Sequence, residues 1–99
     1  MVKILLVCSA GMSTSMMVKK MQGEAEKREL ESKIWAVGDA EAAENIKEAD
    51  VMLLGPQVRF LESKMKGVAE GKPVAVIDML AYGTMDGAKV LDQALNLIR

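Results

Sequence analysis

Three short apolar runs recur along the chain, at residues 3–7, 51–54 and 74–77. Each run is rich in β-branched residues and is continuous rather than alternating, which is typical of strands buried on both faces of a parallel sheet. A fourth run at residues 33–37 is shorter and more mixed, so it predicts an edge strand.

Helical periodicity fills the intervals between these strands. Apolar residues recur three and four positions apart within 14–25, 58–68 and 90–98, with charged and polar residues on the remaining positions. A weaker helix is predicted over 40–47, with Asp39 as its N-cap. The predicted order of elements is therefore β-α-β-α-β-α-β-α.

Strict alternation with short connections predicts right-handed crossovers and a parallel sheet covered by helices on both faces. For four strands we expect the order 2-1-3-4, a flavodoxin-like α/β arrangement similar to that of low-molecular-weight tyrosine phosphatases. Residues 1–99 are expected to form a single domain, since a chain of this length builds one core. Ligands of such sheets lie beyond the carboxyl ends of the strands, where the strand order reverses between strands 1 and 3.

The segment after the first strand lies at this switch point and carries the candidate chemistry. It contains no proline, and all its side chains except that of Met12 are small or hydroxylated. A loop that leads into a helix N-terminus presents several backbone N–H groups to one point, an arrangement suited to phosphate. The predicted phosphate-binding residues are Ser9, Ala10, Gly11, Met12, Ser13, Thr14 and Ser15.

Cys8 is the candidate nucleophile, because cysteines at helix N-termini are the ones that commonly react as thiolates. A free cysteine at the end of a buried strand is often only a small core residue, and hydroxyl side chains before a helix are often only caps. The combination of a lone cysteine, a polar loop and a switch point favours the functional interpretation.

Composition narrows the possible chemistry. The chain has no histidine, so it can form neither a Ser-His nor a Cys-His pair, and it cannot itself carry phosphohistidine. A single cysteine permits no intramolecular disulfide and no usual zinc site, and we expect no metal and no cofactor. A formal charge of −1 argues against nucleic acid as a partner, and no apolar run reaches the roughly 20 residues of a membrane span. We therefore expect a cytoplasmic protein.

The chain resembles the IIB components of the bacterial phosphoenolpyruvate-dependent sugar phosphotransferase system, in particular the lactose/cellobiose/chitobiose family. The resemblance covers essentially the whole sequence and is most specific at residues 6–15, 49–57 and 73–78, followed by Tyr82-Gly83. It implies that Cys8 accepts a phosphoryl group from a phosphohistidine of the IIA component. Cys8 would then pass the group to a sugar, a β-linked disaccharide, that is bound by the membrane permease IIC. The same resemblance implies that the chain meets the membrane only through IIC.

Two residues beyond the loop are candidates for accessory roles. Gln57 follows the third strand, where it contacts the phosphate or a partner, or caps the next helix. Tyr82 brings its hydroxyl or its ring near the loop, or is a half-buried structural residue. Asp78, after the fourth strand, is interpreted as a turn or cap residue.

Methionines supply a hypothesis about partners. Met12 in the loop and Met16, which lies off the apolar stripe of the first helix, are candidates for a flexible docking surface, although both can equally fill gaps in the core. Met17, Met21 and Met65 are predicted to lie in the core.

Four alternatives come from other classes of protein. A phosphatase-like hydrolase with a Cys8 phosphoenzyme would need an arginine six residues after the cysteine, where Thr14 stands. A response-regulator receiver would need an aspartate at the end of the third strand, and a thiol redox protein or arsenate reductase would need a second cysteine. A purely structural binding module remains open if Cys8 is inert.

Overall fold

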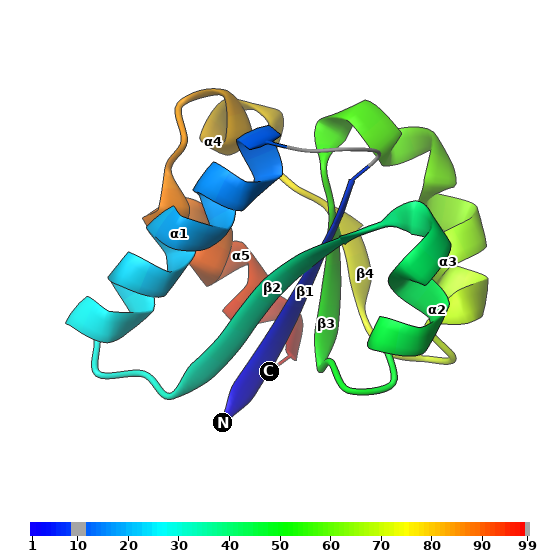
Figure 1. Cartoon of the computed structure of the whole chain (residues 1–99), viewed down its shortest axis with the longest axis horizontal. Helices are drawn as coiled ribbons and strands as arrows, with labels where there is room; N and C mark the ends of the chain where they lie inside the picture. Colours follow the sequence, from blue (N-terminus) through cyan, green and yellow to red (C-terminus); the bar gives the residue numbers. More distant parts are fainter. Residues whose placement is uncertain (9–11, 99) are drawn as a thin grey trace.

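The computed structural model describes residues 1–8 and 12–98, and the side chains of the first helix from Thr14 onward (Figure 1). The strands are β1 (Val2–Cys8), β2 (Ser32–Gly38), β3 (Val51–Leu54) and β4 (Val74–Val76). The α-helices are α1 (Met12–Lys27), α2 (Ala42–Asn45), α3 (Glu62–Val68), α4 (Met79–Gly83) and α5 (Gly87–Ile98). Two 3₁₀ helices, η1 (Asp39–Glu41) and η2 (Pro56–Leu61), precede α2 and α3.

The four strands form one parallel sheet in the order β2-β1-β3-β4, which confirms the predicted topology. β2 and β3 lie on opposite sides of β1, so the β1–β2 and β2–β3 crossovers run in opposite directions. This reversal creates the switch point at the carboxyl ends of β1 and β3. Cys8 is the last residue of β1 and pairs in register with Gly38 of β2.

Helices cover both faces of the sheet, and alternate residues of each strand supply two apolar cores. Ile4 and Leu6 of β1 pack with α1 and α5, whereas Leu5 and Val7 pack with α2 and α3. All four of these side chains are fully buried, as is the whole of β3, so the prediction of burial on both faces is confirmed for β1 and β3. It is wrong for β4, where Ala75 and Val76 are only partly buried, because β4 is an edge strand. The predicted core methionines are buried as well: Met17, Met21 and Met65.

The structure differs from the predicted elements in three places. The edge strand β2 has seven residues, as many as β1. The helix predicted over 40–47 is shorter, because η1 takes up residues 39–41 and α2 ends at Asn45. Asp39 was wrongly expected to be a cap: it lies inside η1, whose N-cap is Gly38 with no side-chain hydrogen bond. The helix α4 was not predicted, since five residues are too few to show a helical period.

Charged side chains tie the two helices of one face together. Nη1 of Arg28, the residue directly after α1, lies 2.7 Å from Oδ1 of Asp92 in α5, and its Nε lies 3.0 Å from Oε2 of Glu24 in α1. The hydrogen bond to Asp92, and then that to Glu24, raise the pKa of Arg28 above its ordinary value. Across the part of the chain that the structure describes, no helix has the length and apolar character needed to cross a membrane.

Candidate functional site

The carboxyl ends of β1, β3 and β4 bring three segments together at one edge of the sheet. The start of α1, the 3₁₀ helix η2 and the helix α4 all lie at this edge, at the top of Figure 1. The residues that contact one another across these segments are 25 or more positions apart in sequence. Only the topology of the sheet therefore brings the segments together. We call this region the carboxyl edge.

Cys8 lies at the centre of the carboxyl edge, with its side chain 6% exposed. Next to it lies Gly55, the residue directly after β3. The N–H of Gly55 donates to the carbonyl oxygen of Val7 over 2.9 Å. A β-carbon placed on Gly55 would lie 3.7 Å from the β-carbon of Cys8. The cysteine is thus held by two neighbouring strands, with its position fixed by backbone pairing.

The predicted phosphate-binding residues divide into three groups. Ser9, Ala10 and Gly11 lie outside the described residues, and Met12 and Ser13 form the first residues of α1. Thr14 is described fully: it is 1% exposed and is the buried polar residue of this helix turn. Ser15 and Met16 lie on the exposed face of α1.

The two predicted accessory residues, Gln57 and Tyr82, contact each other, and Tyr82 also contacts α1. Its hydroxyl lies 3.3 Å from Oγ1 of Thr14, and Nε2 of Gln57 donates to the same hydroxyl oxygen over 3.0 Å. The prediction that the Tyr82 hydroxyl lies near the start of α1 is therefore confirmed. Gln57 does not cap a helix as was expected, because neither η2 nor α3 has a side-chain cap.

Two polar side chains fix the position of α4, which carries Tyr82. Oδ2 of Asp78 accepts from the backbone N–H of Ala81 over 2.9 Å, which confirms its predicted role as a helix cap. Gln93 of α5 accepts from the N–H of Asp78 over 3.0 Å and donates to the carbonyl oxygen of Val76 over 2.8 Å. No sequence pattern pointed to Gln93, since a glutamine between apolar helix positions is usually a solvated residue.

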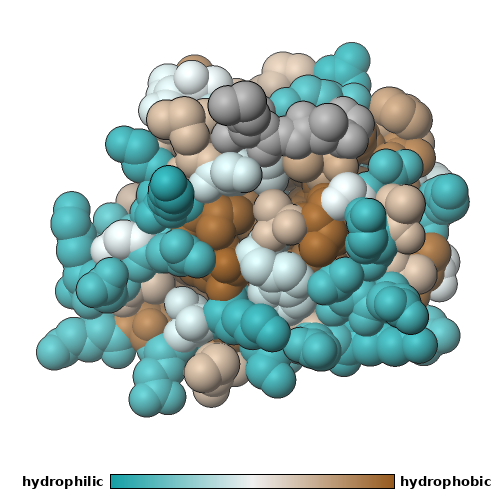
Figure 2. Space-filling view, viewed as in Figure 1, coloured by the Kyte–Doolittle hydropathy of each residue, from teal (hydrophilic) through white to brown (hydrophobic). Residues whose placement is uncertain are grey.

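Large apolar side chains are exposed on the three segments that surround Cys8. Figure 2 shows apolar colours mixed with hydrophilic ones at the upper end of the molecule. We call this set the apolar rim, and its members are Met16, Phe60, Met79 and Leu80. Phe60 and Leu80 are 76% and 68% exposed. Met16, for which a surface position and a core position were equally expected, is exposed, and the side chain of Met12 lies outside the described part of the chain.

Comparison with known proteins shows to which family this chain belongs. The family model described as "PTS system, Lactose/Cellobiose specific IIB subunit" matches residues 3–93. This chain belongs to that family. It is 49% identical over 99% of its length to the oligo-beta-mannoside-specific EIIB component of Bacillus subtilis, of which 97% is covered. It is 43% identical over 96% of its length to the galactose-specific EIIB component of Lactococcus lactis subsp. cremoris, of which 94% is covered.

Solved structures agree with the family. The cellobiose-specific IIB component of Borrelia burgdorferi superimposes with a TM-score of 0.83 at 38% identity, covering 98% of this chain and 91% of that one. The lactose-specific IIB domain of Streptococcus pneumoniae superimposes with a TM-score of 0.88, covering 99% of this chain and 98% of that one. Its identity is 20%, so that likeness concerns the fold.

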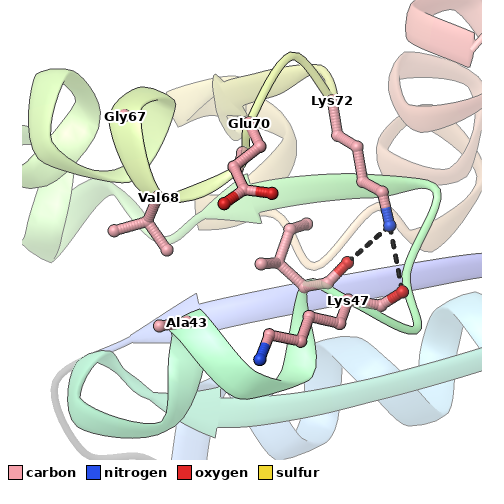
Figure 3. A pocket seen from close by; sticks show the side chains of 8 residues that line it. Ala43, Lys47, Gly67, Val68, Glu70 and Lys72 are labelled. Carbon is pink, nitrogen blue, oxygen red and sulfur yellow. Dashed lines mark hydrogen bonds between the residues drawn. The ribbon is translucent and has the colours of Figure 1, made fainter.

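This IIB subunit also has a shallow pocket at the other end of the molecule, between the ends of α2 and α3 (Figure 3). Lys72 points across it and donates to the backbone carbonyl oxygens of Ile46, Lys47 and Ala49 over 2.8, 3.1 and 2.8 Å. The ammonium group thereby satisfies carbonyls just beyond α2 and uses its three donors in doing so. The described residues include no cluster of three or more His, Cys, Asp or Glu side chains placed to hold a metal ion.

Proposed function

We propose that this IIB subunit carries a phosphoryl group on Cys8 during sugar uptake. The observation that supports it most is the place of Cys8: it ends β1 at the switch point, in the connection to α1, which begins at Met12, in a chain of the IIB family. The backbone N–H groups of residues 9–15, together with the N-terminus of α1, are the proposed cradle for the phosphate. The loop residues in this role are Ser9, Ala10, Gly11, Met12, Ser13, Thr14 and Ser15.

The reaction has two transfers. In the first, the Cys8 thiolate attacks the phosphorus of a phosphohistidine on IIA; the P–N bond breaks and an S–P bond forms. The imidazole leaves as a neutral group after taking up the proton that the Cys8 thiol released. In the second, a sugar hydroxyl attacks the same phosphorus; the S–P bond breaks and the thiolate returns. The hydroxyl proton passes to a base supplied by the IIC permease, where the sugar is bound. The proposed sugar is a β-linked disaccharide, and the protein reaches the membrane through IIC.

The residue in the arginine position explains why transfer is favoured over hydrolysis. Phosphatases with this layout use a guanidinium to hold the equatorial oxygens, where charge gathers in the transition state. In this chain the position is Thr14, a neutral and buried side chain that contacts Tyr82. Without the guanidinium, attack by water gains little stabilisation, while the backbone amides still hold the phosphoryl group in its ground state.

The apolar rim is the proposed docking surface for IIA. A donor imidazole can reach the nearly buried Cys8 only if its protein covers the surrounding surface, and a specific interface buries about 800 Å² on each partner. Phe60, Met79 and Leu80 belong to the segments that flank the cysteine, and exposed aromatic and methionine side chains are enriched in interfaces. IIC takes the group from the same cysteine, so the two partners bind in turn.

Intact-mass measurement tests the proposal. The purified chain is mixed with phosphoenolpyruvate, the general phosphotransferase proteins and a IIA of the lactose/cellobiose family, alongside a Cys8→Ser control. A gain of one phosphoryl group that is absent from the control is the expected result. An unchanged mass with several IIA proteins, accompanied by turnover of an aryl phosphate, would overturn the carrier role and make the protein a hydrolase.

A further inference from the structure

The Tyr82 hydroxyl joins side chains from three separate elements of the carboxyl edge. Gln57 belongs to η2, Tyr82 to α4 and Thr14 to the first turn of α1, and the two contacts measure 3.0 and 3.3 Å. Thr14 is the only one of the three within the proposed phosphate cradle. Tyr82 is hydrogen-bonded to Thr14 and Gln57 to Tyr82, so these bonds connect both residues to the cradle through Thr14.

The chemistry of the groups favours one direction along this chain. The amide nitrogen of Gln57 has only donors, so the Tyr82 oxygen accepts there. If the Tyr82 O–H then donates to Oγ1 of Thr14, the Thr14 hydroxyl keeps its own hydrogen to donate onward. We propose that Gln57, Tyr82 and Thr14 form a neutral donor relay that ends on the phosphoryl group of phospho-Cys8.

Gly55 leaves the space that this relay needs. A β-carbon at residue 55 would lie 2.5 Å from Oε1 of Gln57 and 3.7 Å from the β-carbon of Cys8. The oxygen of the Gln57 carboxamide and the β-carbon of Cys8 therefore both lie next to the space that this glycine leaves open. The start of the relay is thus anchored beside the residue that carries the phosphate.

Hydrogen bonds also fix Tyr82, the middle residue of the relay. The cap from Asp78 and the two hydrogen bonds of Gln93 hold the first turn of α4, and therefore the backbone of Tyr82, against β4 and α5. Burial of Thr14 excludes water from its hydroxyl. Hydrogen bonds in such a low-dielectric setting polarise one another, so a donor two links away strengthens the final donor.

The relay rests on the proposed function, and it explains what takes the place of the arginine that phosphatases have at the position of Thr14. A guanidinium would neutralise the phosphoryl dianion and also stabilise the transition state of hydrolysis. Three neutral donors in series stabilise the dianion without adding a positive charge. Gln57 and Tyr82 are accordingly positioning residues, and Thr14 is the group that touches the phosphate.

The experiment compares phospho-Cys8 in wild-type protein and in Tyr82→Phe by ³¹P NMR during a pH titration. Removing a donor favours the monoanion, so the second pKa of the phosphoryl group should rise by about half a unit in Tyr82→Phe. Phosphoryl transfer from IIA should slow by about fivefold, the effect of one hydrogen bond. Gln57→Met, which removes the first donor and keeps the chain length, should move both quantities in the same direction by less.

Thr84→Val is the matched control, because Thr84 lies directly after α4 and its hydroxyl donates to the carbonyl oxygen of Leu80 over 2.9 Å. It should leave the ³¹P titration unchanged, even where it lowers the melting temperature. A wild-type titration curve in Tyr82→Phe and Gln57→Met would overturn the relay while leaving the carrier role intact. Failure of the wild-type protein itself to gain a phosphoryl group would instead refute the proposed function.

Discussion

Gly87, the first residue of α5, lies against the backbone of Lys20 in α1. A β-carbon at residue 87 would be 2.6 Å from the carbonyl carbon of Lys20 and 2.7 Å from its oxygen. Backbone atoms cannot turn aside as a side chain can, so Gly87→Ala must push α5 away from α1. We expect a loss of about 1–3 kcal/mol in the free energy of unfolding, measured by urea denaturation.

Gly23→Ala, in the same pair of helices, should have the opposite effect on the free energy of unfolding. Gly23 lies in the interior of α1, and a β-carbon there would meet nothing within 4 Å. Alanine is the better helix former, so this variant should gain about 0.5–1 kcal/mol. Equal effects of the two substitutions would show that the close approach of α5 to Lys20 does not govern stability.

Gln93→Met tests whether the anchoring of α4 matters to the site. Methionine keeps the length of the side chain and loses its hydrogen bonds to Val76 and Asp78. Unfolding should become easier by roughly 1–3 kcal/mol, because two polar backbone groups lose their partners. Under the proposed function, transfer from IIA should also slow, since Tyr82 sits on α4. Asn96→Met, at an exposed position one turn further along α5, should change neither quantity.

Phe60→Ser and Leu80→Ser test the apolar rim. Each should raise the KM for phospho-IIA by roughly fivefold or more, as expected when an interface anchor is truncated. The melting temperature should stay near the wild-type value, because both side chains are mostly exposed in the free protein. Glu31→Ser is the control, since Glu31 is exposed and precedes β2 at the opposite end of the sheet. An unchanged KM for both rim variants would place the IIA contact elsewhere.

The topology could be predicted from the sequence because each strand is a compact apolar run and each crossover carries a helical period. Elements without such a pattern escaped prediction. The helix α4 is too short to show a period, and η1 replaced the expected start of a helix because Gly38 and not Asp39 ends the extended backbone.

The candidate site could be located in sequence, but its contacts could not. Cys8 and the residues after it were found from one local segment. The pairing of Tyr82 with Thr14 joins positions 68 residues apart, and that with Gln57 joins positions 25 residues apart. Gln57 was therefore assigned to its nearest helix, since only the assembled sheet shows which side chains meet at its carboxyl edge.

Most methionines whose side chains the structure describes lie either in the interior or at the surface. Met17, Met21, Met52 and Met65 are almost wholly buried, whereas Met16 on α1 and Met79 on α4 are more than half exposed. Mild oxidants therefore reach the surface thioethers first and convert them to polar sulfoxides. Chemical ageing of a stored sample would accordingly alter the neighbourhood of the cysteine while the fold still appeared intact by circular dichroism.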